Sequence, residues 1–366
     1  MTAEANKVEA RELVQLARLA VTGKRTDLVL YIRRLAKRYR LSFPELAEEL
    51  TSVVRQVPDS SSVLRGTVVD GIPVDQDSRL QLARPEYPVE LDIEPIWGDQ
   101  LRSDLEQIVV EREMEMKLAD ADLHPTKSAL FVGPPGVGKT LAARWIAKKL
   151  NRPLIVLDLS AVMSSFLGRT GNNIRNVLDY AKGLSCVLLL DEFDAIAKRR
   201  DDAVEIGELK RLVTVLLQEI DEWPASGLLL AATNHPDLLD PAVWRRFELI
   251  VEFPMPSEAD VRRAVELFLG EDAEEKKWGG VLARAFSNAS YAEIRRDLLR
   301  AKRNAVVHGH SSLVPLQRIV QERTVGLDRE GRVEIALGLM TRGLSQREAH
   351  EWTGVSRDTI RKAAQQ

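Results

Sequence analysis

Cysteine is almost absent from this sequence, and so are long apolar segments and any large excess of charge. The chain of 366 residues contains one cysteine, which excludes an internal disulfide framework. No apolar run approaches the roughly 18 residues that a membrane-spanning helix needs. The formal net charge is −3, from 52 lysines and arginines against 55 acidic residues. This balance excludes a uniformly basic nucleic-acid-binding protein, although it leaves room for a local basic patch.

These absences also bear on location and size. Cys186 lies in an apolar run, so we expect a small buried core residue and not a reactive thiol. The N-terminal residues contain no apolar region of the signal-peptide type, which predicts a soluble, cytoplasmic protein with no membrane partner. A hydrophobic content of 45 % supports a real core, and the length indicates two or three domains.

One stretch carries the strongest signal: residues 129–140 read Ala-Leu-Phe-Val-Gly-Pro-Pro-Gly-Val-Gly-Lys-Thr. An apolar run typical of a buried strand leads into the phosphate-loop pattern of glycine, four residues, glycine, lysine and threonine. Its glycines let backbone N–H groups turn toward phosphate oxygens, and the following helix directs its positive dipole end at the same anion. Lys139 is expected to reach the β- and γ-phosphates, and Thr140 to ligate Mg²⁺. The residues predicted to bind ATP are Gly133, Pro134, Pro135, Gly136, Val137, Gly138, Lys139, Thr140 and Leu141.

Four more apolar runs follow, separated by stretches with helical patterns. They cover residues 154–157, 186–190, 228–232 and 249–253. Alternation of this kind predicts an α/β fold, a P-loop NTPase parallel sheet with helices on both faces. Ligands of such sheets bind beyond the carboxyl ends of the strands, which is where the remaining polar motifs fall.

Carboxylates and an amide end two of these runs. Asp191 can hold Mg²⁺ opposite Thr140, and Glu192 is placed to orient and deprotonate an attacking water. Asn234 could donate to the γ-phosphate or to that water. In isolation, the acidic pair could equally begin a helix, and the asparagine could simply end a strand.

Two adjacent arginines, Arg245 and Arg246, precede the last apolar run. They could be ordinary surface charges. They could equally act as arginine fingers, which stabilise transition-state charge in the site of a neighbouring subunit.

Taken in order, residues 133–140, 191–196, 232–236 and 239–247 resemble the motifs of the AAA family of ring ATPases. The resemblance spans roughly residues 94–308 and implies a helical lid after Pro254. It implies that Asn234 is the first sensor and that Arg246 is the principal finger. The family often carries a second arginine three residues later, but position 249 is leucine, so either Arg245 substitutes or a single finger suffices.

The same resemblance implies functions for further segments of the chain. Phe166-Leu167-Gly168 resembles the first pore loop, whose aromatic side chain grips an extended polypeptide substrate, and residues 198–207 would form a second, charged channel loop. Residues 290–294 resemble the second-sensor segment, with Tyr291 where glycine is usual. Arg295 could then approach the nucleotide, or be an exposed helix arginine.

The N-terminal part predicts helices over residues 3–56, with a basic run at 33–40. This run could contact an acidic partner or nucleic acid, or be a solvated face balanced by nearby glutamates. A Pro- and Ser-rich stretch with an Asp70-Gly71 turn predicts a linker with a small hairpin. The predicted division is 1–56 helical, 57–95 linker, 96–254 nucleotide-binding, 255–325 lid and 326–366 C-terminal module.

The C-terminal module shows helix, glycine turn and serine-capped helix over residues 343–362, and it resembles the helix-turn-helix of resolvases and response regulators. Residues 328–366 carry seven basic and six acidic residues, which is a weak footprint for DNA binding, so protein docking remains an alternative. Side chains that would face the major groove are Ser356, Arg357, Thr359 and Arg361.

The preferred hypothesis is a Mg²⁺- and ATP-dependent ring motor that remodels or threads a protein substrate. A site needing two subunits predicts a closed homo-oligomer, expected to be a hexamer. By resemblance, a separate peptidase, for example a subtilisin-like one, could be its partner, since the chain has no protease motif of its own. The alternative is a DNA-bound regulatory ATPase recruited through the C-terminal module. A non-hydrolysing scaffold is disfavoured by Glu192.

Overall fold

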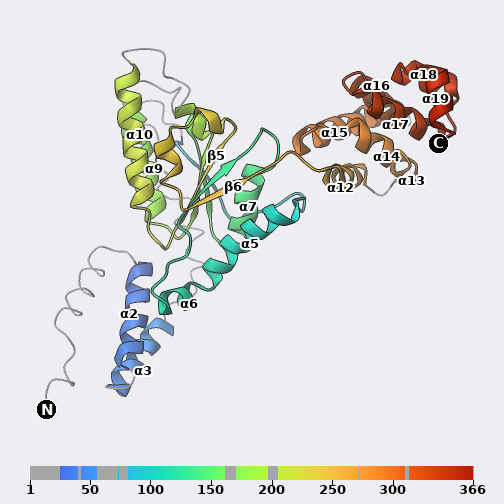
Figure 1. Cartoon of the computed structure of the whole chain (residues 1–366). Helices are drawn as coiled ribbons and strands as arrows, with labels where there is room; N and C mark the ends of the chain where they lie inside the picture. The colour runs from blue at the N-terminus through green and yellow to red at the C-terminus, as the bar shows by residue number, and fades with distance from the viewer. Residues whose placement is uncertain are drawn as a thin grey trace.

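The computed structural model describes residues 25–39, 43–55, 73, 81–160, 170–196, 205–270, 272–309 and 313–365. An α/β unit built on one sheet is followed by an all-helical region toward the C-terminus (Figure 1). The predicted hairpin at Asp70-Gly71, the triplet Phe166-Leu167-Gly168 and residues 198–204 lie outside the described residues, so these stay predictions. None of the helices in the described part of the chain combines the length and hydropathy needed to cross a bilayer.

The sheet has six strands in the order β1-β3-β4-β5-β2-β6. All neighbours pair in parallel except β1, which runs antiparallel to β3 at the edge. The strands are β1 Arg84–Glu86, β2 Ser128–Val132, β3 Leu154–Asp158, β4 Val187–Asp191, β5 Leu228–Thr233 and β6 Leu249–Glu252. All five predicted apolar runs are therefore strands. The sixth, β1, lies in the stretch predicted as a linker, and Pro85 at its centre is tolerated because the strand lies at the edge.

Helices cover both faces of the sheet, which is why its strands are apolar on both sides. Alternate residues of β2 divide between two cores: Ala129 and Phe131 pack with α5 and α7, and Leu130 and Val132 pack with α9 and α10. Figure 1 shows these two pairs of helices on opposite sides of the strands. The elements of this layer are α5 Asp99–Glu113, α6 Glu115–Asp120, α7 Lys139–Lys149, α9 Thr170–Lys182 and α10 Glu205–Asp221, with the short turns η1 Phe193–Ile196, η2 Pro236–Leu238 and α11 Pro241–Trp244.

A buried arginine fastens α5 to the sheet. Arg112 donates to the carbonyl oxygens of Thr126, Ala225 and Gly227 at 2.6, 2.6 and 2.7 Å. Burial lowers the pKa of Arg112 to about 10, so the guanidinium is still charged at neutral pH. Because these carbonyls immediately precede β2 and β5, the arginine fixes the start of the two strands that lead to the predicted phosphate loop and to Asn234.

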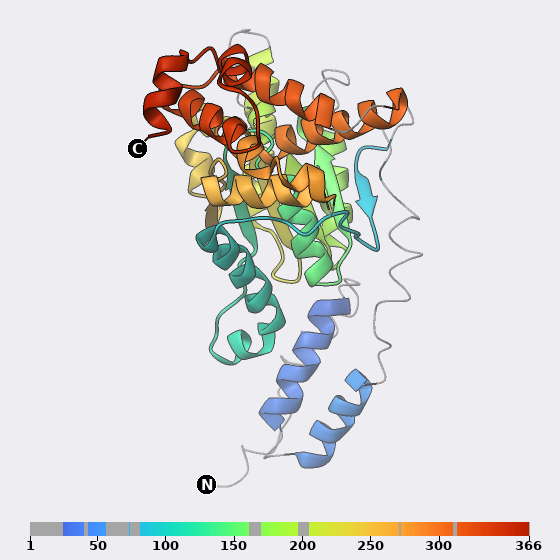
Figure 2. The same cartoon turned by 90° about the vertical axis from the view of Figure 1, so that its right-hand side faces the viewer.

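The C-terminal helices form a second body. They are α12 Glu258–Leu269, α13 Ala273–Lys276, α14 Gly279–Ala285, α15 Tyr291–His308, α16 Leu313–Thr324, α17 Arg329–Met340, α18 Gln346–Thr353 and α19 Arg357–Ala363. All of them except α13 contribute buried side chains to one apolar cluster that runs from Val261 in α12 to Ile360 in α19. Residues on both sides of the predicted boundary at residue 325 belong to this core, and Figure 2 shows these helices gathered together in front of the sheet.

Serine caps begin α15, α18 and α19 in this body, and those of α18 and α19 were predicted from the sequence. Ser290 and Ser345 each accept from the backbone N–H three residues on, with a glutamate completing the capping box. Ser356 caps α19 in the same way through Thr359.

At the other end of the described chain, α2 Arg25–Tyr39 packs against α3 Pro44–Arg55. Both helices lie within the range 3–56 that was predicted to be helical. The basic run lies on α2, where Lys37 pairs with Asp120 at the end of α6. This contact joins the N-terminal helices to the α/β unit.

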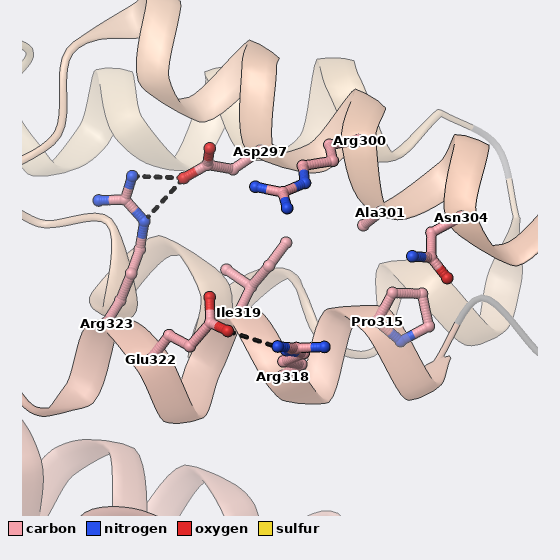
Figure 3. Close-up of a pocket in the computed structure, with 9 residues that line it drawn as sticks. All are labelled: Asp297, Arg300, Ala301, Asn304, Pro315, Arg318, Ile319, Glu322 and Arg323. Carbon is pink, nitrogen blue, oxygen red and sulfur yellow. Dashed lines mark hydrogen bonds and ion pairs between the residues drawn. The ribbon is translucent and has the colours of Figure 1, made fainter.

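A polar pocket of about 180 Å³ lies between α15 and α16, as Figure 3 shows. On one side of it Arg323 donates twice to Asp297 Oδ2, at 3.2 and 2.5 Å, and its guanidinium stacks 4.4 Å from the Phe286 ring centre. Burial raises the pKa of Asp297, but hydrogen bonds from Arg323 and Arg296 outweigh that effect and hold the pKa below its ordinary value. The pair therefore clamps α15 to α16.

Loss of this clamp should be visible in stability and in its pH dependence. A carboxyl group with a lowered folded-state pKa stabilises the fold above its unfolded pKa, and the contribution is lost as pH falls through the folded value. Asp297→Asn is expected to lower the free energy of unfolding by about 1–3 kcal/mol near neutral pH. In urea titrations, the difference from the unmodified chain should shrink as the pH falls below the ordinary carboxyl pKa and through the lowered folded-state value.

The matched control is Asp358→Asn. Asp358 pairs with Arg361 inside α19, but both side chains are more than half exposed. Its loss is expected to cost less than about 1 kcal/mol. Equal effects of the two substitutions, or an Asp297→Asn effect that does not vary with pH, would contradict the assignment.

Candidate nucleotide site

The segment between β2 and α7 is a tight loop whose shape depends on glycine. Gly136 has φ of +79°, and a Cβ there would lie 2.6 Å from Ser290 Oγ. A Cβ on Gly133 would lie 2.2 Å from the Phe253 carbonyl oxygen. Both positions therefore require glycine. Gly136 adopts a left-handed backbone conformation, and at both positions a side chain would clash with a neighbouring oxygen. The predicted glycine pattern therefore makes a closed cradle.

Lys139 is the first residue of α7 and is buried. Its Nζ donates to the carbonyl oxygens of Gly133 and Pro134 at 2.6 and 2.9 Å and to Asn234 Oδ1 at 2.8 Å. Burial lowers the pKa of Lys139 to about 8, against the opposing influence of the Asp191 and Asp194 carboxylates. The ammonium is thus held in the mouth of the loop, between the ends of β2 and β5.

Thr140 and Asp191 meet as predicted, although 50 residues separate them in the sequence. Thr140 Oγ1 donates to Asp191 Oδ2 at 3.0 Å. A hydroxyl and a carboxylate oxygen side by side are hard oxygen donors of the kind that Mg²⁺ binds together with substrate phosphates. The residues present therefore fit a Mg²⁺–nucleotide complex.

Glu192 follows β4 in a strained backbone conformation. Its φ is +53°, in the left-handed region that costs a residue with a side chain roughly 1–2 kcal/mol. Its backbone N–H donates to Asp191 Oδ1 at 3.0 Å, and its exposed side chain lines the same pocket as Lys139. The chain leaves the regular strand here, which turns Glu192 toward the loop. Nothing in the residue pattern indicates this strain.

Asn234 stands one residue beyond β5, beside Lys139. Its backbone N–H donates to Asp194 Oδ1 at 3.2 Å, and the Thr233 hydroxyl donates to the same oxygen at 3.1 Å. Asp194 was not singled out from the sequence, because its partners lie some 40 residues downstream and no local pattern pairs them. It is 4 % exposed.

These groups line a pocket of about 670 Å³. Three parts of the chain enclose it: the loop and strand ends, the segment after β1, and the helical region. The helical region is tied to the loop because Ala292 N–H donates to the Gly136 carbonyl oxygen at 3.1 Å. Residues from outside the loop and strand ends that line the pocket include Glu86, Asp92, Ile93, Phe268, Tyr291 and Arg295.

Arg295 therefore does lie at the pocket, where it pairs with Asp92 at 3.5 Å. Tyr291 lines both this pocket and a smaller apolar one beside it, together with Ile93 and Phe268. Sequence reasoning missed a third cation: Arg144 of α7 donates to both oxygens of Glu86 at 2.9 Å, which raises its pKa. This ion pair fixes β1 against the nucleotide-binding helix.

The two candidate fingers lie elsewhere, since neither lines the pocket. Arg246 pairs with Asp221 at the end of α10, and both side chains are partly exposed. Arg245 is exposed, and within the described ranges no hydrogen bond or ion pair is assigned to it. Neither arginine contacts the groups around Lys139 within its own chain.

In the C-terminal module, the candidate groove-facing side chains lie near the start of α19. Ser356 and Thr359 share the cap hydrogen bonds, and Arg361 pairs with Asp358 at 2.6 Å. Arg347 of α18 pairs with Glu351. Arg357 is exposed.

Comparison with known proteins supports the interpretation of this pocket as a nucleotide-binding site. The family model described as ATPase family associated with various cellular activities (AAA) matches residues 129–255. An uncharacterized AAA family ATPase of Sinorhizobium fredii is 46 % identical over 138 residues, which are 38 % of this chain and 42 % of the relative. A proteasome-activating nucleotidase of Methanococcus maripaludis is 34 % identical over 206 residues, 52 % of this chain and 49 % of the relative.

The similarity to one eukaryotic relative is longer but weaker. The 26S proteasome regulatory subunit 10B homolog A of Arabidopsis thaliana is 29 % identical over 278 residues, 71 % of this chain and 69 % of the relative. The chain spans about half the length of the first two relatives. The matched family, the loop geometry and the groups around Lys139 together identify residues 129–255 as an ATPase domain of the AAA family.

Proposed function

We propose that this chain hydrolyses ATP with Mg²⁺ and works as a ring motor that remodels or threads a protein substrate. One observation carries the hydrolytic part: Lys139, Asn234 and the Thr140–Asp191 pair converge on a single pocket beside Glu192. The similarity to proteasome-activating nucleotidases supports the motor part.

Each group of the pocket has a role that its geometry supports. Lys139 exchanges its hydrogen bonds to the loop carbonyls for hydrogen bonds to phosphate oxygens. The backbone N–H groups of the loop donate to the other phosphate oxygens of the triphosphate. Thr140 and Asp191 would hold Mg²⁺, which neutralises developing charge on the phosphates when bound. Glu192 orients the attacking water and accepts its proton, and the Asn234 amide, which lines the same pocket, helps to hold that water.

The site is proposed to be completed by a neighbour. Arg246 lies outside the pocket of its own chain, so it can act only in the site of another copy. A contact of that kind joins unlike faces of identical subunits and closes into a ring, here proposed to be hexameric. In the single chain, Asp221 keeps the Arg246 guanidinium occupied until the neighbour arrives. Arg245 is the alternative finger.

The substrate is proposed to be a polypeptide gripped in the ring by Phe166, Leu167 and Gly168. Support comes from the similarity to the proteasome-activating nucleotidase of Methanococcus maripaludis. By that analogy, the partner of this chain is a separate peptidase in the cytoplasm.

The alternative, recruitment to DNA through residues 343–362, has weaker support. Arg361 and Arg347 are each paired with a carboxylate on their own helix, so within this segment, which the structure describes in full, the exposed Arg357 and Lys362 are the cations that remain for contact with phosphate.

The Glu192→Gln substitution tests the hydrolytic role directly. It keeps the shape of the side chain but removes the proton acceptor, so steady-state turnover is expected to fall by at least about 100-fold. ATP binding, measured by equilibrium dialysis, should change less than about threefold. Glu252→Gln, at the end of β6 and also exposed, is the control and should turn over normally. Unchanged turnover in the Glu192 variant would overturn the assignment.

The shared site makes a different prediction for mixtures. Lys139→Ala and Arg246→Ala chains should each be inactive alone, because one lacks the cradle and the other the finger, worth roughly 10³-fold. Mixed before assembly, they should regain part of the turnover, since some interfaces then combine an intact cradle with an intact finger. Repeating the mixture with Arg245→Ala decides which arginine is the finger. No recovery in either mixture would show that the site works within one chain.

Substrate grip and DNA binding can be separated in one set of assays. Phe166→Ala should abolish the stimulation of ATPase activity by an unfolded protein such as casein, and Phe166→Tyr should retain it, because only an aromatic ring is needed.

Filter binding to duplex DNA at about 0.1 M salt is expected to show no difference between the unmodified chain and Arg357→Ala/Arg361→Ala. Binding that the double variant loses would favour the DNA-bound regulator.

A further inference from the structure

A buried carboxylate that the proposed reaction does not use lies directly behind the site. Asp194 belongs to η1 and is 4 % exposed. One of its oxygens, Oδ1, receives hydrogen bonds from the Thr233 hydroxyl at 3.1 Å and from the Asn234 backbone N–H at 3.2 Å. Burying a carboxylate costs several kcal/mol unless donors compensate it, and these two contacts contribute to that compensation.

The two ends of this contact carry the two groups that must meet the attacking water. Glu192 is two residues before Asp194, in the turn that leaves β4, and Asn234 is the residue whose N–H Asp194 accepts. No contact between Glu192 and Asn234 themselves is assigned in the described part of the chain. The carboxylate is thus a direct crosslink between the segment with the proposed base and the segment with the proposed sensor.

The same contact continues to the phosphate loop. Asn234 Oδ1 accepts from Lys139 Nζ, and Lys139 in turn bonds the carbonyl oxygens of Gly133 and Pro134. Asp194 also acts on Lys139 at a distance, since its charge raises the pKa that burial lowers. The Asp194 contact thus belongs to the same hydrogen-bonded network as Lys139, with Asn234 as the residue between them.

We propose that Asp194 is a positioning residue for ATP hydrolysis, which holds Asn234 at the correct place relative to Glu192 so that both side chains reach one water. This inference rests on the hydrolytic roles proposed above for Glu192 and Asn234. Asp194 is not among the residues that line the pocket, so it acts through the end of β5.

A double-mutant cycle separates positioning from a merely structural role. Asp194→Ala is expected to lower kcat by roughly 10- to 100-fold, as a misplacement near 1 Å does, with the Kd for Mg²⁺–ATP by equilibrium dialysis changed less than about threefold. In a chain that already carries Asn234→Ala, the same substitution should change kcat by less than about twofold, because the residue through which it acts is gone. Asp194→Asn keeps an oxygen acceptor for both donors and should restore most of kcat.

Three outcomes overturn the proposal or part of it. An Asp194→Ala loss of the same size in both backgrounds assigns the residue a general structural role. An Asp194→Asn variant as slow as Asp194→Ala shows that charge and not geometry matters. If Asn234→Ala alone leaves kcat unchanged, the proposed sensor role fails, which is a separate result from failure of the crosslink.

A milder variant covers the case in which Asp194→Ala does not fold, as judged by its melting temperature. Thr233→Val removes one of the two donors and keeps the carboxylate. It is expected to lower kcat by a smaller factor, of about two- to fivefold, and to have no effect in the Asn234→Ala background. An equal effect in both backgrounds would contradict the proposal in the same way.

Discussion

A single buried ammonium group organises the α/β unit around its site. Lys139 Nζ is removed from water and must find oxygen partners, and it finds them in the loop carbonyls and in Asn234. These partners belong to the ends of β2 and β5, which are hydrogen-bonded neighbours in the sheet. The lysine therefore requires the two strand ends to stay in register, and Arg112 fixes the starts of the same strands. Both ends of the central strands are held by a buried cation.

This constraint explains why so much of the site follows from local patterns. The five apolar runs are strands, the glycine loop leads into a helix at Lys139, and Thr140 meets Asp191. Each of these features depends on residues close in sequence, or on the rule that parallel strands end at one edge. The alternating burial of Ala129 and Leu130 on opposite faces has the same origin.

Features that depend on partners distant in the chain could not be predicted from the sequence. Strand β1 exists because β3 offers an unpaired edge, and its proline-containing sequence gives no strand pattern. Asp194 and Arg144 become informative only when their partners, Asn234 and Glu86, are seen beside them. The unusual φ of Glu192 has no signal in residue type. The predicted pore loop remains a prediction, because it lies outside the described residues.

The hydrogen bond from Ala292 to Gly136 has a mechanical consequence, because the helices from α12 to α19 share one continuous core. A body packed in this way moves as a lever and not as a string of independent helices. Its short arm ends at the loop that would clasp phosphate, and its long arm extends to α19 near the chain terminus (Figure 1). We therefore expect a force applied to the distal helices to reach Gly136 through this packed body and through the Ala292–Gly136 hydrogen bond.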